Sequence, residues 1–243
     1  MLQIMSDFIN TILDKHGGTD LWKSFNQLKA TIVSSGRLFD EKGFPQDRSP
    51  RTMTVHLHEQ YASLHPFGTP DLRTNFRPNR VAVETLDGKV VWERNGNPEV
   101  IHQHLLREQW DPLDRAYFNG YALWTYLTSP FFLLIPGITT RETEPWKEGN
   151  EIWRVLEVKF PQTLATHSST QFFYFGEDLL LKRHDYSIDI AGNFEAAQYM
   201  YDPIEVQGFM LPSKRRVYKK GPGGNPLLND LMVSIDIQQV IFS

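Results

Sequence analysis

The sequence predicts a mainly β (α+β) protein: a curved antiparallel sheet or unclosed β-barrel wrapped around a central α-helix, with short N-terminal helices. Most of the chain consists of short segments rich in β-branched and aromatic residues, with turn residues between them. One segment near the middle is helical and apolar around nearly its whole circumference. No part of the chain alternates strands with amphipathic helices, which argues against a doubly wound parallel sheet.

Length and composition indicate one globular domain over residues 1–243. With 40% hydrophobic and 22% charged residues, the chain can bury a substantial core. The 25 basic and 29 acidic residues give a formal charge of −4, and they are scattered along the chain. A nucleic-acid partner is therefore not expected, since binding phosphates requires a concentrated basic surface. The densest basic cluster lies within residues 214–220 and is interpreted as the solvated face of a strand.

The sequence contains no cysteine, which excludes disulfides, a thiolate nucleophile and cysteine-ligated metals. Its most apolar stretch, residues 121–138, is interrupted by Pro130 and Pro136, so we expect no integral membrane span. Residues 1–14 lack a basic segment followed by an unbroken apolar run, so no signal peptide is visible. We therefore expect a cytoplasmic protein, or a periplasmic one if the N-terminus has been trimmed.

Apolar residues at helical spacing predict a first helix over residues 4–15, which Gly17 and Gly18 end. Thr19 or Asp20 can cap a second short helix. Beyond it the apolar period becomes that of strands. The expected strands cover residues 30–39, 52–61, 79–86, 89–94, 151–160, 169–176, 179–190, 194–202, 204–219 and 231–242.

Asp111 and Pro112 predict the start of a long helix over about residues 112–128, because the carboxylate can accept a free amide proton and proline has none. Pro130 ends it. A helix that is apolar on all sides must be enclosed, and in a protein of strands the curved sheet provides the enclosure. The side chains expected to contact a ligand between this helix and the sheet are Tyr117, Phe118, Tyr121 and Trp124.

Sequence motifs for nucleotide binding, a nucleophile elbow or a zincin site are absent, so we expect no cofactor. His56 and His58 share one face of a predicted strand and could together bind a metal. The same face is otherwise polar, so solvated histidines explain the pattern and we expect no metal site.

The predicted strand over residues 179–190 carries the best candidates for polar contacts with a ligand. Alternation places Lys182, His184, Tyr186, Ile188 and Ile190 on one face, and Arg183, Asp185, Ser187 and Asp189 on the other, which is far more polar. His184 and Tyr186 should therefore point inward. They are candidates for a general acid and base, and the alternative is that they only satisfy hydrogen bonds in the core. Asp185 lies on the opposite face from His184, which disfavours a triad with the hydroxyls of Thr166 or Ser168.

A recognisable order of elements runs along the chain: His16-Gly17-Gly18, Leu21-Trp22, a strand ending at Gly36, the central helix, and a late strand pair through Tyr201-Asp202, Val206–Gly208 and Leu211-Pro212. This order resembles that of the LolA/LolB-like lipoprotein-carrier superfamily, which includes the LppX-type proteins. The residues around Phe160-Pro161, Thr166–Ser168, Gln171–Phe175 and Arg183–Tyr186 also resemble a bacterial branch of unassigned function. The resemblance implies an unclosed barrel whose concave side holds acyl chains or another hydrophobic molecule.

Three hypotheses of function remain open at this stage. The first is binding or carriage of a hydrophobic, lipid-like small molecule between the sheet and the central helix. The alternative is an enzyme acting on such a molecule in the same cavity, with His184 and Tyr186 as acid and base. A third is a structural protein with a filled core and no ligand. The sequence specifies neither the ligand, nor whether the protein is an enzyme, nor its oligomeric state.

Overall fold

The computed structural model describes residues 7–45, 48–188 and 194–243. Its strands are β1 (Gln27–Ser35), β2 (Arg51–His56), β3 (Ala62–His65), β4 (Leu72–Arg77), β5 (Arg80–Thr85), β6 (Val90–Asn95), β7 (Thr139–Glu148), β8 (Glu151–Lys159), β9 (Thr170–Phe175), β10 (Leu181–Ile188), β11 (Phe194–Val206), β12 (Phe209–Lys220) and β13 (Pro226–Phe242). Its α-helices are α1 (Asp7–Lys15), α2 (Thr19–Lys23), α3 (Arg37–Glu41), α4 (Pro98–Leu105) and α5 (Pro112–Thr128).

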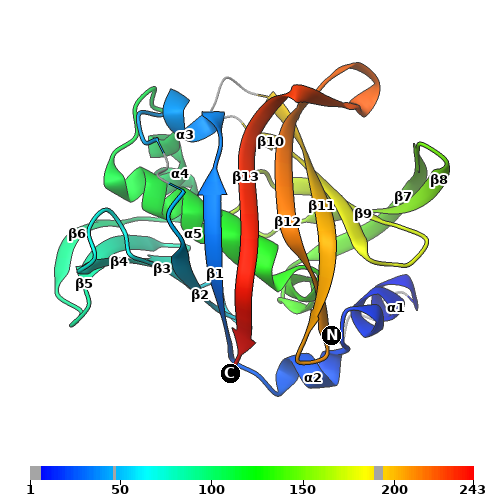
Figure 1. Ribbon diagram of the computed structural model, residues 1–243, viewed down its shortest axis with the longest axis horizontal. Helices are drawn as coiled ribbons and strands as arrows, with labels where there is room; N and C mark the ends of the chain where they lie inside the picture. The colour runs from blue at the N-terminus through cyan, green and yellow to red at the C-terminus, as the bar shows by residue number, and fades with distance from the viewer. Residues whose placement is uncertain (1–6, 46–47, 189–193) are drawn as a thin grey trace.

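The thirteen strands form one antiparallel sheet in the order β6-β5-β4-β3-β2-β1-β13-β12-β11-β10-β9-β8-β7. The last strand, β13, pairs with the first, β1. The first and last strands of the chain therefore lie side by side in the middle of the sheet (Figure 1). β6 and β7 are the free edges, so the sheet curves without closing. The predicted mainly β, unclosed architecture is confirmed.

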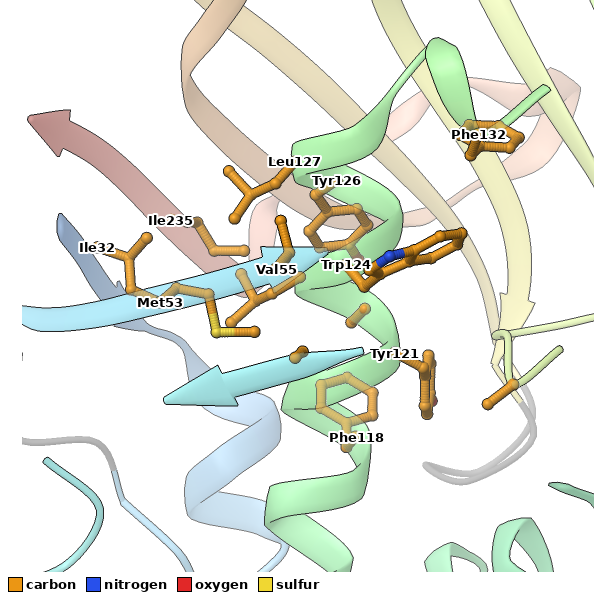
Figure 2. Packing of buried hydrophobic residues seen from close by; sticks show 14 of the residues in the cluster. Ile32, Met53, Val55, Phe118, Tyr121, Trp124, Tyr126, Leu127, Phe132 and Ile235 are labelled. Atoms are coloured by element: carbon orange, nitrogen blue, oxygen red, sulfur yellow. The ribbon is translucent and has the colours of Figure 1, made fainter. Parts of the chain in front are cut away.

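Helix α5 lies on the inner side of this curved sheet and packs against β2 to β5 (Figure 1). Its bounds are those predicted, and Asp111 begins it with a capping box shared with Asp114. Every residue from Ala116 to Thr128 is buried, so the prediction of an enclosed helix is confirmed. Figure 2 shows apolar side chains projecting from α5 in several directions, with Met53 and Val55 of β2 beside the helix.

Several predicted strand boundaries are wrong for local reasons. The strand expected over residues 30–39 ends at Ser35, because Gly36 adopts φ 135° and begins helix α3. The strand expected over residues 52–61 ends at His56, and a turn follows it.

The boundary predicted between residues 194–202 and 204–219 is also wrong. The break expected at Pro203 does not occur, because Pro203 sits inside β11 opposite Pro212 of β12. The turn between these strands falls at Gln207 and Gly208, both at positive φ. Residues 4–6 of the predicted first helix, and residues 189 and 190 of a predicted strand, lie outside the described residues.

Gly120 allows α5 to approach β4 closely. A Cβ atom at this position would overlap the ring of Phe76, which is fully buried on β4. We predict that Gly120→Ala lowers the free energy of unfolding by about 1 to 3 kcal/mol, although alanine is the better helix former by about 1 kcal/mol. Urea unfolding followed by tryptophan fluorescence measures this change.

A second substitution tests whether the loss of stability comes from the overlap with Phe76. Phe76→Ala should destabilise the Gly120→Ala protein less than it destabilises the wild type, because it removes the Cγ and Cδ1 atoms that the alanine Cβ at position 120 would overlap. An increase in stability on Gly120→Ala alone would contradict the close packing of α5 against β4.

Candidate functional site

A cleft of about 620 Å³ lies between α4 and the segment formed by residues 160–169. This volume is within the range of roughly 300 to 1,000 Å³ that small-molecule sites occupy. Apolar side chains form much of its surface, among them Leu106, Tyr117, Phe160 and Leu164. Polar groups at its border come from Glu99, His102, Gln103, Thr166 and His167.

Helix α4 forms one wall of the cleft, and sequence analysis gave no prediction for it. Asn97 caps its first turn by accepting a hydrogen bond of 2.9 Å from the backbone N–H of Val100, and Pro98 occupies the first helical position. Ile101 and Leu105 are fully buried and attach the helix to the core. The Asn97-Pro98 pair repeats the capping signal of Asp111-Pro112, so it could have revealed this helix.

The opposite wall, residues 160–169, is held by a side chain from the turn between β2 and β3. Gln60 accepts a hydrogen bond of 2.8 Å from the backbone N–H of Ala165 and donates one of 2.7 Å to its carbonyl oxygen. Gln60 is buried, although alternation along the strand predicted over residues 52–61 would place it on the polar face with His56. The wall is therefore fixed at its centre without belonging to a helix or strand.

Tyr117 of α5 and His167 reach the cleft from the core. Nε2 of His167 lies 2.9 Å from the hydroxyl of Tyr126, and that hydroxyl lies 2.8 Å from the hydroxyl of Tyr186. The rings of His167 and Tyr186 are stacked with centroids 4.1 Å apart. A hydrogen-bonded chain therefore leads from the cleft to β10.

His184 lies deeper in the same polar cluster and faces away from Asp185. Its Nε2 is 2.6 Å from Oε1 of Gln171, and its ring stacks on that of Phe173 with centroids 4.1 Å apart. Asp185 instead forms an ion pair with Arg183, with Nε and Oδ1 2.6 Å apart. The two side chains lie on opposite faces of β10, so Asp185 does not orient the imidazole of His184.

Burial keeps the titratable members of this cluster neutral. It lowers the pKa of His167 to about 3 and raises the pKa of Tyr126 to about 12. Burial, with smaller contributions from His167 and Arg215, holds the pKa of His184 well below its usual value. Burial, reinforced by Tyr126, raises the pKa of Tyr186 well above its usual value.

Arg215 corrects the interpretation of residues 214–220 as a solvated face, because its side chain is only 1% exposed. It donates to the carbonyl oxygen of Tyr126 and, over 2.9 Å, to Oε1 of Gln198. Burial lowers the pKa of Arg215 to about 10, so it remains charged near neutral pH. Pro130 has no N–H to bond the Tyr126 carbonyl, four residues earlier, and Arg215 replaces the missing donor.

The second face of β10 is also buried, contrary to its polar pattern. Arg183 is fully buried beneath an aromatic cluster on the outer side of the sheet. Its guanidinium carbon lies 4.8 Å from the ring centroid of Trp146, 5.0 Å from that of Tyr174 and 5.3 Å from that of Tyr199. Such cation–π contacts, with the carboxylate of Asp185, compensate the buried charge.

The ligand-facing residues predicted on α5 occupy two kinds of environment. Tyr117 lines the cleft, whereas Phe118, Tyr121 and Trp124 belong to the packed core. The enclosed space between α5, β10 and β13 is about 20 Å³, which suffices for one water molecule. Side chains therefore fill the space between helix and sheet, and the larger hollow lies outside α5.

Comparisons with known proteins relate this chain to others by fold. No protein-family model and no curated protein matches the sequence. A LolA superfamily protein from Nitrosomonas europaea has 10% identity and a TM-score of 0.51, over 96% of this chain and 92% of its own. A DUF1329 family protein from Desulfovibrio piger has 11% identity and a TM-score of 0.52, over 98% and 94%. The chain has a LolA-like fold.

A third structure of this fold comes from Vibrio parahaemolyticus and is named as a domain of an outer membrane lipoprotein-sorting protein. It has 6% identity and a TM-score of 0.51, over 98% of this chain and 91% of its own. The resemblance found in the sequence is therefore confirmed for the fold.

None of the described helices has the length and apolar character to cross a membrane. In residues 7–45, 48–188 and 194–243, no three His, Asp or Glu side chains converge as a metal site requires.

The buried histidines predict a loss of stability in mild acid. Burial lowers the pKa of His16 to about 4 and of His167 to about 3, and also lowers that of His184, so the unfolded chain binds more protons below about pH 6.5. The free energy of unfolding should fall by about 1 kcal/mol per pH unit for each of them between about pH 6 and pH 5. Urea unfolding at a series of pH values measures the slope.

The variant His184→Gln tests whether His184 contributes to this slope. Glutamine can still hydrogen-bond Gln171 but does not titrate. The free energy of unfolding of this variant should therefore fall less steeply with decreasing pH than that of the wild type, by about 1 kcal/mol per pH unit. Equal slopes for both proteins would contradict a neutral, buried His184.

Proposed function

We propose that this protein binds or carries a hydrophobic small molecule in the cleft between α4 and residues 160–169. The observation that carries the proposal is a cleft of about 620 Å³ with apolar side chains on walls that the core holds in place. The lipoprotein-sorting name of the similarly folded Vibrio parahaemolyticus domain supports a hydrophobic ligand. The cytoplasmic location expected from residues 1–14 stays a prediction.

The predicted site residues take different parts in this proposal. Tyr117 contacts the ligand directly, because it lines the cleft. Phe118 and Tyr121 contact the ring of His167 from within the core, whereas Trp124 is a core residue without such a contact in the described structure. Tyr186 acts through Tyr126 on His167, and His184 packs behind Tyr186 with ring centroids 4.5 Å apart. A ligand between α5 and the sheet would have to displace side chains that now fill that space.

The enzyme hypothesis with His184 and Tyr186 as acid and base is less well supported. A general acid or base works best when its pKa lies near the working pH and when it can reach the substrate. The pKa of His184 is lowered and that of Tyr186 is raised, both by burial, which moves each away from neutral pH. Neither side chain lines the cleft. The third hypothesis, a structural protein without a ligand, gives the cleft no role.

Filling the cleft tests the proposal. Gln103 is exposed on α4 and lines the cleft, so Gln103→Trp should place a bulky ring in the space with little effect on the core. We expect affinity for the neutral fluorescent probe N-phenyl-1-naphthylamine to fall about tenfold or more, because steric exclusion removes apolar contacts worth more than about 1.4 kcal/mol. Fluorescence titration measures this affinity.

Val100→Trp is the matched control, since Val100 is 48% exposed on the same helix and does not line the cleft. It should bind the probe as the wild type does. Native mass spectrometry of protein purified without denaturation would show whether a natural ligand copurifies with the control and is lost from Gln103→Trp. Unchanged probe binding by Gln103→Trp would contradict the proposed location.

A further inference from the structure

The charge of the cleft limits the kind of ligand that it can hold. All of its lining residues lie within the described chain, and none of them is lysine or arginine. Glu99 is the only carboxylate among them, and it lies in the first turn of α4, where it complements the positive end of the helix dipole. An anionic head group such as a carboxylate or phosphate would find no cation here to compensate its loss of hydration.

The polar group best placed to orient a ligand is the imidazole of His167. This side chain is 5% exposed and lines the cleft. Its Nε2 is engaged with Tyr126, and its Nδ1 is buried without a hydrogen-bond partner among the residues that the structure describes. A buried ring nitrogen without a partner costs free energy, which a ligand that reaches it would recover.

The hydroxyls behind His167 determine what Nδ1 can do. If Tyr186 donates to Tyr126, then Tyr126 donates to Nε2, and the proton of the neutral imidazole sits on Nδ1. If both hydrogen bonds reverse, Nε2 carries the proton and Nδ1 becomes an acceptor. A ligand hydroxyl satisfies both states, since it can accept as well as donate.

We propose that the cleft binds an uncharged amphiphile whose polar group is a hydroxyl, hydrogen-bonded to Nδ1 of His167, with its apolar chain along Leu106, Phe160 and Leu164. This inference rests on the proposed function and specifies its ligand class. A fatty acid, a phospholipid and an alkylammonium ion are the excluded alternatives. The first two bring a negative charge to a lining without lysine or arginine, and an ammonium group would find only Glu99, whose exposed carboxylate is screened by solvent.

Three probes with the same ten-carbon chain test the inference: decan-1-ol, decanoate and decylammonium. Each competes with N-phenyl-1-naphthylamine bound to the full-length protein near neutral pH. We expect decan-1-ol to displace the dye at a concentration at least about tenfold lower than either ion does. Each ion loses hydration around a charge that the cleft does not fully compensate, and this loss weakens its binding. In His167→Phe, which keeps an aromatic ring beside Tyr186, this preference for the alcohol over the ions should narrow.

His65→Phe is the matched control, because it makes the same change at a half-buried histidine that does not line the cleft. Its preference for decan-1-ol should equal that of the wild type. If His167→Phe does not fold, nitrogen NMR of histidine-labelled wild type provides the test. Addition of decan-1-ol should then shift the Nδ1 resonance of His167, and an unmoved resonance would overturn the contact.

The failure of this inference differs from the failure of the proposed function. Displacement by decanoate or decylammonium as effective as that by decan-1-ol would overturn the uncharged ligand class, while the cleft would remain a binding site. Absence of dye binding to the wild type, with no displacement by any probe, would overturn both.

Discussion

The burial of α5 from Ala116 to Thr128 is the constraint on which the rest of the structure depends. A helix leaves free N–H groups at its start and free carbonyl groups at its end, and in a buried helix side chains must satisfy them. At the start, Asp111 and Asp114 form a capping box, and Arg94 of β6 pairs with both carboxylates. At the end, Arg215 of β12 bonds the Tyr126 carbonyl that Pro130 leaves free. The two arginines come from strands far apart in the sheet, so the helix connects its two halves.

The same constraint explains why a polar cluster lies on the apolar inner side of the unclosed sheet. Arg215 must be buried to reach the helix end, and it needs further acceptors and polarisable rings around it. Gln198 supplies an acceptor, and the ring centroid of Tyr126 lies 5.0 Å from the guanidinium carbon. Tyr126 then connects this buried end to Tyr186 and His167. The imidazole at the cleft is thus positioned by a network whose origin is structural.

Residues with local signals could be predicted, and residues buried by distant contacts could not. Asp111-Pro112 and Pro130 define α5, and strand alternation correctly turns His184 and Tyr186 inward, because both depend on neighbours in sequence. Arg183 and Arg215 look like surface residues, since the aromatic cluster and the helix end that cover them lie elsewhere in the chain. The cleft escaped prediction because its two walls, α4 and residues 160–169, are brought together only by the fold.

Because side chains fill the interior of this LolA-like fold, the ligand site that we propose lies on the outside of α5, in the cleft. A crystal structure with 12-bromododecan-1-ol bound tests this directly, because the anomalous signal of bromine locates the end of the chain. We expect the hydroxyl next to His167, the bromine among the apolar residues near Leu106, and α5 unmoved. Bromine between α5 and the sheet, with the helix displaced, would contradict this account.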